Sequence, residues 1–242
     1  MPKPTLWQIP EPGTDVLAAL PAKTAVLAER LRHIAAGHQD VRLASSLAAE
    51  DMLLTDVIAA QALPISVFTL QTGRLNAETL ALLAQVPQRY PQLAWAVYAP
   101  DAAAVAHYVQ THGENAFYHS VDLRRECCRI RKIEPLERAL AGADAWLTGQ
   151  RREQSPTREA LPLAETDAAR GMAKYNPIYD WTEAEVWAYV RTHDVPVNAL
   201  YRQGYPSIGC EPCTRPVRLG EDIRAGRWWW ESRDSKECGL HK

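Results

Sequence analysis

Five cysteines are the residues in this sequence best suited to chemistry, and four of them form two tight pairs. Cys127 and Cys128 are adjacent, and Cys210 and Cys213 form a C-x-x-C motif far downstream. Thiolates are soft ligands, and a set of four suits Zn²⁺ or an iron–sulfur cluster. Adjacent cysteines are not a standard half-site for zinc, so the pattern favours iron–sulfur over zinc. A Cys127–Cys128 disulfide is disfavoured, because adjacent Cα atoms lie only ~3.8 Å apart. Four buried, unreactive thiols are the other interpretation, but two tight pairs would then be a coincidence.

The fifth cysteine, Cys238, stands near the end of the sequence, in Glu237-Cys-Gly-Leu-His-Lys242. A thiol near a chain end is mobile and reachable, and Gly239 lets this tail bend. A neighbouring cation lowers a thiol's pKa and enriches the thiolate, which is the nucleophilic form. His241 is close enough in sequence to act on Cys238 or on its substrate. A lone terminal cysteine can equally be an unreactive surface thiol, and the pattern leaves both interpretations open.

Composition excludes several classes of protein. The 242 residues are 47% apolar and carry a formal net charge of −2, which suits one large domain with an appendage. Without a basic excess, the chain is not expected to bind nucleic acid. No apolar stretch suggests a signal peptide or a membrane span. An odd number of cysteines without a secretion signal predicts reduced thiols in the cytoplasm.

Apolar periodicity predicts strands that alternate with helices. We expect a proline-rich extended arm over residues 1–21, helices over 22–36, 49–61, 76–90 (capped by Asn76), 101–111 (capped by Asp101) and 182–194, and strands over 41–44, 65–70, 93–98 and 145–148. This alternation predicts an α/β fold with a mostly parallel twisted sheet and helices on both faces. We expect a nucleotide-binding α/β domain with the iron–sulfur site over residues 22–214. Residues 215–242 then form a C-terminal segment, with a flexible tail, that carries Cys238.

Ligands of parallel α/β sheets bind beyond the C-terminal ends of the strands. The candidate site loops are therefore Ser45-Ser46, residues 72–74 and residues 149–152. Residues 150–171 read as one long loop with four arginines, Arg158 among them. Such a loop suits a lid over an anion, but a solvated surface loop is an equal alternative.

Several long motifs resemble those of the assimilatory adenylyl-sulfate reductases, in register over roughly residues 38–242. They are ECCRIRKIEPLERAL (126–140), WLTGQRREQS (146–155), GCEPCTR (209–215), GEDIRAGRWWWE (220–231) and ECGLHK (237–242). The resemblance implies an adenine nucleotide alpha hydrolase-like fold. It also implies a [4Fe–4S] cluster on Cys127, Cys128, Cys210 and Cys213. In this family the cluster keeps its redox state during turnover, and its expected role is to order Lys132 beside the sulfate.

The activity that the resemblance implies is reduction of adenylyl sulfate to sulfite and AMP in sulfate assimilation. Cys238 is the expected nucleophile and forms an S-sulfocysteine, which a thioredoxin-type thiol then cleaves. The expected cations at the anionic groups are Lys132, Arg224, Arg227 and His241. The residues expected to hold the nucleotide are Ser45, Thr72, Gly73, Arg74 and Gly149, with Arg158 closing from its loop.

Two departures from the family pattern concern the nucleotide site. The segment after the first strand, ASSLAAED (44–51), lacks the usual glycine, which weakens the case for a tight phosphate loop there. The common LDTGR is here LQTGR (70–74), so that a role for a carboxylate at Gln71 is in doubt.

Other functions stay open. A phosphoadenylyl-sulfate reductase shares this fold but typically lacks the four clustered cysteines, and an enzyme that uses both substrates is a further alternative. A tRNA-thiolating enzyme would need a Ser-Gly-Gly-x-Asp-Ser loop and a basic face, which this sequence lacks. A non-catalytic nucleotide-binding module held by zinc is the remaining class. The sequence does not decide the oligomeric state, and a homo-oligomer is one option.

Overall fold

The order of the strands places the ends of β1 and β4 side by side in the middle of a six-stranded sheet. The computed structural model describes residues 4–155 and 158–232. The strands are β1 (Val41–Ser45), β2 (Ile65–Leu70), β3 (Trp95–Tyr98), β4 (Ala145–Leu147), β5 (Ala164–Asp167) and β6 (Met172–Tyr175). Their order is β3-β2-β1-β4-β6-β5, and only β5 runs antiparallel to its neighbour. This confirms the predicted, mostly parallel sheet.

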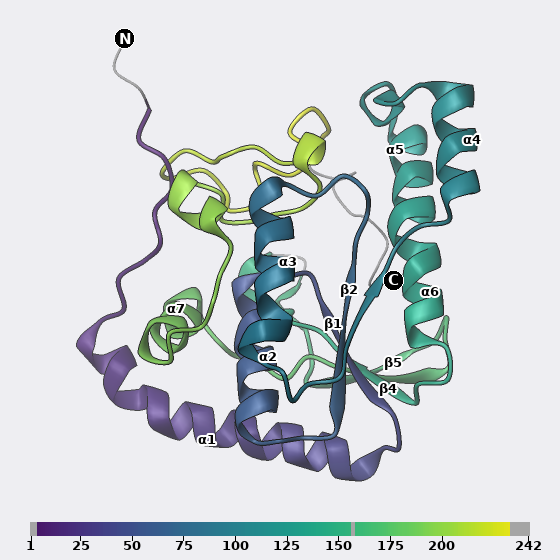
Figure 1. Ribbon diagram of the computed structural model, residues 1–242. Coiled ribbons are helices and arrows are strands. Elements are labelled where there is room, and N and C mark those ends of the chain that lie inside the picture. Colours follow the sequence, from purple (N-terminus) through teal and green to yellow (C-terminus); the bar gives the residue numbers. More distant parts are fainter. Residues whose placement is uncertain (1–3, 156–157, 233–242) are drawn as a thin grey trace.

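Helices cover both faces of the sheet, as predicted (Figure 1). The helices that pack on one face are α1 (Thr14–Gly37), α2 (Ala49–Ala60), α3 (Ala77–Arg89) and α7 (Glu183–Thr192). On the other face lies α6 (Glu134–Leu140), with α4 (Ala102–His112) and α5 (Val121–Cys128) beyond it. The short helices are η1 (Ala116–Tyr118), η2 (Arg129–Ile133), η3 (Arg152–Gln154), η5 (Ala199–Gln203) and η6 (Glu211–Cys213). Among the described helices, none is both long and apolar enough to cross a bilayer.

Alternation along the strands divides the interior into two apolar clusters. In β1, Val41 and Leu43 face the large cluster beneath α1, α2 and α7. Phe68 of β2 and Trp146 of β4 face the opposite way, against Leu136 of α6. Successive side chains of a strand point to opposite faces, so that strands covered on both sides are rich in apolar residues on each face. This is why the segments 41–44 and 65–70 were recognisable from the sequence.

Two helix starts were predicted correctly, and two details were wrong. Asp101 accepts a hydrogen bond from the Ala104 N–H at the start of α4, and Thr182 and Glu185 form a capping box at α7. Asn76 occupies the N-cap position of α3, but its side chain donates to the Gly209 carbonyl at 3.3 Å instead of capping. The extended arm over 1–21 is also wrong, because α1 begins at Thr14.

Pro21 explains the misplaced start of α1. A proline inside a helix removes a hydrogen bond and costs ~3 kcal/mol, so the sequence favoured a start after it. Val16 and Leu20 pack against the large cluster, however, and this burial of apolar surface offsets the lost bond.

The segment 150–171 is not one loop, since β5 lies within it and pairs with β6. Asp167 and Arg170 close the turn between the two strands with a hydrogen bond of 2.6 Å, and Gly171 takes a left-handed φ of 67°. Residues 164–167, Ala-Glu-Thr-Asp, lack the apolar alternation that marks a strand, which explains the wrong prediction.

The cysteine-bearing helix is irregular. Between α5 and α6 the chain forms one π-helical turn, η2, and Pro135 lies in the first turn of α6, where its missing N–H is harmless. Such π-turns often occur at functional sites. The segment after α7 returns over the C-terminal ends of the strands, shown from green to yellow in Figure 1.

Candidate functional site

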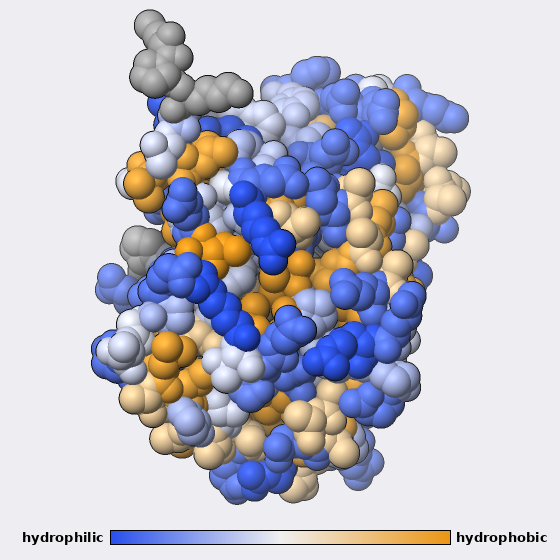
Figure 2. Space-filling view, turned by 60° about the vertical axis from the view of Figure 1, so that its left-hand side comes forward, coloured by the Kyte–Doolittle hydropathy of each residue, from blue (hydrophilic) through white to orange (hydrophobic). Residues whose placement is uncertain are grey.

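A cavity of about 270 Å³ opens at the C-terminal ends of β1, β2 and β4. It lies where the strand order reverses between β1 and β4, the usual binding position of an open α/β sheet. The segments that line it are 44–51, 68–70, 148–151, 206–210, 223–224 and 227–228, together with single residues from other elements. On the face drawn in Figure 2, apolar residues gather toward the middle among hydrophilic ones.

The loop after β1 turns tightly although it contains no glycine. Leu47, which is buried, adopts a left-handed φ of 64°. The carboxylate of Asp51 accepts from the Ser46 N–H at 2.7 Å and from the Ser46 hydroxyl at 2.6 Å. Burial raises the pKa of Asp51 to about 6, although hydrogen bonds from Ser46 and Gly149 act against this rise. The hydrogen bonds of Asp51 thus hold the loop in a tight turn with a left-handed residue, a conformation that glycine usually provides.

Gly149, just after β4, approaches the same carboxylate. A Cβ atom at this position would lie 2.3 Å from Oδ1 of Asp51 and 2.9 Å from Cβ of Glu50. Both atoms belong to the first turn of α2, so the loop after β4 can reach α2 only with glycine here.

Replacing Gly149 with Ala should therefore destabilise the protein. We expect the free energy of unfolding to fall by about 1–3 kcal/mol, as for other overpacked sites. Chemical denaturation measures this change. Gly37→Ala is the matched control, because a Cβ there meets nothing within 4 Å. Equal denaturation midpoints for the two variants would contradict the close approach of Gly149 and Asp51.

A buried ion pair fixes the loop that follows Gly149. Arg151 is almost fully buried and donates from Nη2 to Oε1 of Glu50 at 2.8 Å. Gln154 donates to the same oxygen at 2.9 Å, and Arg158 donates to the side chain of Gln154. Arg158 consequently reaches the cavity from a loop that Glu50 anchors.

Three of the predicted cations line the cavity, namely Lys132, Arg224 and Arg227. Arg227 donates to the Ile208 carbonyl at 3.0 Å, and its guanidinium carbon lies 4.9 Å from the centre of the Trp228 ring. Nζ of Lys132 lies 6.0 Å from the same ring. Trp228 therefore sets the spacing of two cations on one wall.

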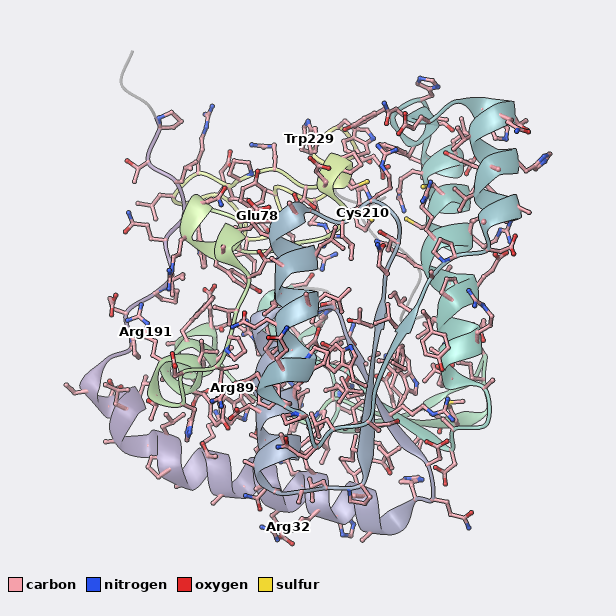
Figure 3. The ribbon with its side chains drawn as sticks, in the orientation of Figure 1. Arg32, Glu78, Arg89, Arg191, Cys210 and Trp229 are labelled. Atoms are coloured by element: carbon pink, nitrogen blue, oxygen red, sulfur yellow. The ribbon has the colours of Figure 1, made fainter. Side chains whose placement is uncertain are left out.

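The four paired cysteines come together around a second, small cavity that adjoins the first. The stick view places Cys210 at the end of the molecule where the C-terminal segment meets α5 (Figure 3). An antiparallel bridge between Leu75 and Cys210, and a Glu211 N–H that donates to the Arg74 carbonyl at 2.8 Å, hold the C-x-x-C turn on the loop after β2. The Thr72 hydroxyl lies 3.3 Å from Sγ of Cys210.

The thiols of this cavity differ in acidity. Burial opposes a charge on Cys210, but Lys132, the Thr72 hydroxyl and Arg227 outweigh it, so the pKa of Cys210 lies below its usual value. Burial and the charge of Cys128 raise the pKa of Cys127 to about 11, and burial and the charge of Cys210 raise that of Cys213 to about 12. Neighbouring thiolates in one buried cavity repel each other, and the positive charge of bound metal ions offsets this repulsion.

The donor set fits a polynuclear metal group. Among the described residues, no three Cys, His, Asp or Glu side chains converge as ligands of one metal ion would. The four cysteines instead line one shared cavity, and an iron–sulfur cluster takes a separate thiolate on each iron. Arg74, Arg124, Arg131 and Lys132 also line this space, so its charge balance suits anionic thiolates and sulfides.

The predicted site residues do not all meet. Ser45, Thr72, Lys132, Gly149, Arg158, Arg224 and Arg227 line the first cavity. Gly73 and Arg74 do not: Arg74 pairs with Glu114 at 2.9 Å and faces the thiol cavity. The Gln71 side chain accepts from the Gly73 N–H, so a neutral amide forms this turn. Cys238 and His241 lie outside the described residues.

Sequence reasoning missed Glu50, Asp51 and Arg131. The acidic pair that opens the helix after β1 could have indicated the first two, since carboxylates at a helix start often bind loop N–H groups. Arg131 donates to the Thr72 carbonyl at 2.8 Å, and only the fold brings these two residues together.

Comparisons with known proteins agree with this arrangement. A protein from Neisseria meningitidis serogroup B, named adenosine 5'-phosphosulfate reductase, is 62% identical over 240 residues, which are 99% of this chain and 98% of that protein. The crystal structure of phosphoadenylyl-sulfate (PAPS) reductase from Candida auris, a phosphate complex, matches with a TM-score of 0.69 at 26% identity and covers 86% of this chain and 100% of that one.

A more distant structure shares the fold alone. The NH3-dependent NAD synthetase from Campylobacter jejuni has a TM-score of 0.52 at 12% identity, over 72% of this chain and 73% of that one. Together these structures confirm the adenine nucleotide alpha hydrolase-like fold. Residues 40–216, more than half of the sequence, match the phosphoadenosine phosphosulfate reductase domain. The chain therefore belongs to the phosphoadenosine phosphosulfate reductase family.

Proposed function

We propose that this protein reduces adenylyl sulfate to sulfite and AMP, with Cys238 as nucleophile and a thioredoxin-type dithiol as reductant. The observation that carries the proposal is that Lys132 and Cys210 line both cavities. The four-thiol site therefore adjoins a pocket of the size and position expected for a nucleotide. The high identity to proteins named adenosine 5'-phosphosulfate reductase supports the unphosphorylated substrate.

The lining of the first cavity suits both halves of such a substrate. Phe68, Leu70 and Trp146 offer apolar surface for an adenine ring. Arg224, Arg227 and Lys132 offer positive charge for the phosphate and sulfate groups. These cations stabilise the negative charge that the leaving AMP gathers. Arg158 closes the pocket from its loop.

The chemistry consists of two displacements at sulfur. The Cys238 thiolate attacks the sulfur of adenylyl sulfate, an S–S bond forms, and the S–O bond to the phosphate breaks as AMP leaves with the electron pair. A thiolate of the donor then attacks Sγ of Cys238, and sulfite leaves with the electron pair of the cleaved S–S bond. The donor's second thiol resolves the mixed disulfide, so the donor is oxidised and Cys238 is restored. A dithiol donor of this kind fits the reducing cytoplasm.

We assign a [4Fe–4S] cluster to Cys127, Cys128, Cys210 and Cys213. When bound, such a cluster would supply a fixed charge beside the pocket, and the thiol donor would supply the electrons. Lys132 lies between the thiol cavity and the substrate pocket, so the cluster's charge would hold the ammonium group beside the sulfate. The alternative is that the same cysteines bind zinc, in which case the protein would be a non-catalytic nucleotide-binding module.

A sulfite assay with both nucleotides tests the substrate. With thioredoxin, thioredoxin reductase and NADPH, we expect kcat/KM for adenylyl sulfate to exceed that for the 3'-phosphorylated nucleotide at least tenfold. A preference for the phosphorylated nucleotide would assign the protein to the other substrate, and similar values would indicate dual use. Brown protein that contains iron supports the cluster, whereas colourless protein that contains zinc supports the non-catalytic module.

A further inference from the structure

A buried ion pair joins the cysteine-bearing helix to the last part of the described chain. Arg124 of α5 donates from Nε to Oε1 of Glu231 at 2.9 Å, and from Nη2 to Oε2 at 2.8 Å. The two side chains are 0% and 4% exposed. A forked guanidinium matches a carboxylate in one relative orientation, so this pair fixes the direction as well as the position of residue 231.

The turn just before Glu231 lines the nucleotide pocket and packs against the paired cysteines. Trp228 is 1% exposed, and its backbone has a φ of 40°, a left-handed conformation that a bulky side chain rarely adopts. The Arg124 guanidinium carbon lies 4.7 Å from the centre of the Trp228 ring, and the Glu231 N–H donates to the Trp228 carbonyl at 2.9 Å. Arg227, next in sequence, lines the nucleotide pocket. A strained conformation of this kind persists only where its surroundings hold it.

The same pair marks the point from which the terminal segment departs. Cys238 follows Glu231 closely in sequence, and an extended residue spans at most about 3.3–3.6 Å, so the Cα atoms of these two residues stay within about 25 Å of each other. Trp229, next to Trp228, lies toward the same end of the molecule as Cys210 (Figure 3). The position of Glu231 therefore limits where Cys238 can act.

We propose that Arg124 and Glu231 are positioning residues, which fix the 227–231 turn on α5 and so place both Arg227 and the start of the segment that carries Cys238. Neither residue needs to touch the substrate. The inference rests on the proposed function in one respect, the assignment of Cys238 as nucleophile. It adds that the cysteine-bearing helix orients the nucleophile's segment through an ion pair, whose arginine also lines the thiol cavity.

Glu231→Gln tests the proposal, because it keeps the shape of the side chain and removes the charge. Asp180→Asn is the matched control: Asp180 accepts two hydrogen bonds of 2.7 Å from Arg30, on the α1 side of the molecule. Adenylyl sulfate is mixed with each protein without a thiol donor, and mass spectrometry follows the sulfonate on Cys238. At saturating nucleotide, we expect adduct formation to slow at least tenfold in Glu231→Gln while its iron content is unchanged. In Asp180→Asn, we expect the rate of adduct formation to match that of the wild type.

Limited trypsin digestion supplies a readout that needs no substrate. We expect cleavage after Arg224 and Arg227 to speed up at least tenfold in Glu231→Gln and not in Asp180→Asn. A normal adduct rate together with normal cleavage would show a purely structural pair and overturn the proposal. If the wild-type protein forms no adduct, the proposed function fails, and digestion alone then decides whether the pair anchors the turn. If Glu231→Gln loses iron, Arg124→Lys is tested in its place. This variant keeps the positive charge but loses the forked guanidinium, and we expect the same slower adduct formation and faster cleavage.

Discussion

Replacement of Cys238 by Ser is expected to abolish sulfite release while nucleotide binding and the brown colour persist. A serine hydroxyl is a far weaker nucleophile than a thiolate near neutral pH, and loss of a nucleophile costs on the order of 10³-fold or more in rate. The four paired cysteines are untouched by this change, and they surround their own cavity. Sulfite assays, AMP titration calorimetry and visible absorption measure the three properties separately.

The control for this variant lies in the same segment. Ser235→Ala alters a neighbouring polar side chain without removing a thiol, and its turnover should match that of the wild type. Mass spectrometry of the wild type with adenylyl sulfate and no donor should find the sulfonate on Cys238. Turnover by Cys238→Ser, or a sulfonate on another residue, would remove Cys238 from the proposed chemistry.

Replacement of Cys210 by Ser is expected to remove iron and activity together. Cys210 is a buried thiol, and nearby cations with the Thr72 hydroxyl lower its pKa, whereas burial raises the pKa of Cys127 and Cys213. A serine hydroxyl keeps its proton at neutral pH and is a poor ligand for iron. We expect the iron content to fall to background and sulfite release to fall at least 10²-fold, because Lys132 then loses the charged group beside it.

A matched variant separates ligand loss from a disturbed turn. The Tyr118 hydroxyl donates to the Pro212 carbonyl at 2.6 Å, inside the same C-x-x-C turn, so Tyr118→Phe loosens the turn without touching a sulfur. Iron should stay in Tyr118→Phe. Iron analysis and visible absorption of both variants decide the matter, and Cys210→Ser protein that remained brown and active would refute the ligand assignment.

The strongest local signals were read correctly because they do not depend on distant residues. The strands β1 and β2 are rich in apolar residues, and the cap Asp101 is set by a neighbour three residues away. The polar strand β5 escaped prediction because its stability comes from pairing with β6. Pro21 misled in the opposite way, since the packing of Val16 and Leu20 overrides a strong local preference.

The candidate site shows the same division. Seven of the residues that line the first cavity were expected: the loops after parallel strands indicated Ser45, Thr72 and Gly149, and the family resemblance implied Lys132, Arg158, Arg224 and Arg227. The missing glycine after β1 also weakened the case for a tight phosphate loop there. The structure shows instead that Asp51 holds this loop and that Leu47 takes the left-handed turn. The expected place of Arg74 in the nucleotide pocket finds no support, because Arg74 lines the thiol cavity and pairs with Glu114.

Residue types and spacing alone indicated which side chains suit chemistry: two cysteine pairs, a solitary cysteine near the terminus, and polar loops after the strands. These features follow from residue types and short spacings, which can be read without knowing the tertiary structure. Only the tertiary structure decided that the two pairs surround one space, that Lys132 belongs to both cavities, and that Glu231 reaches back to Arg124. Such contacts join residues far apart in the chain, and their energies arise only once the core has packed and water has been excluded.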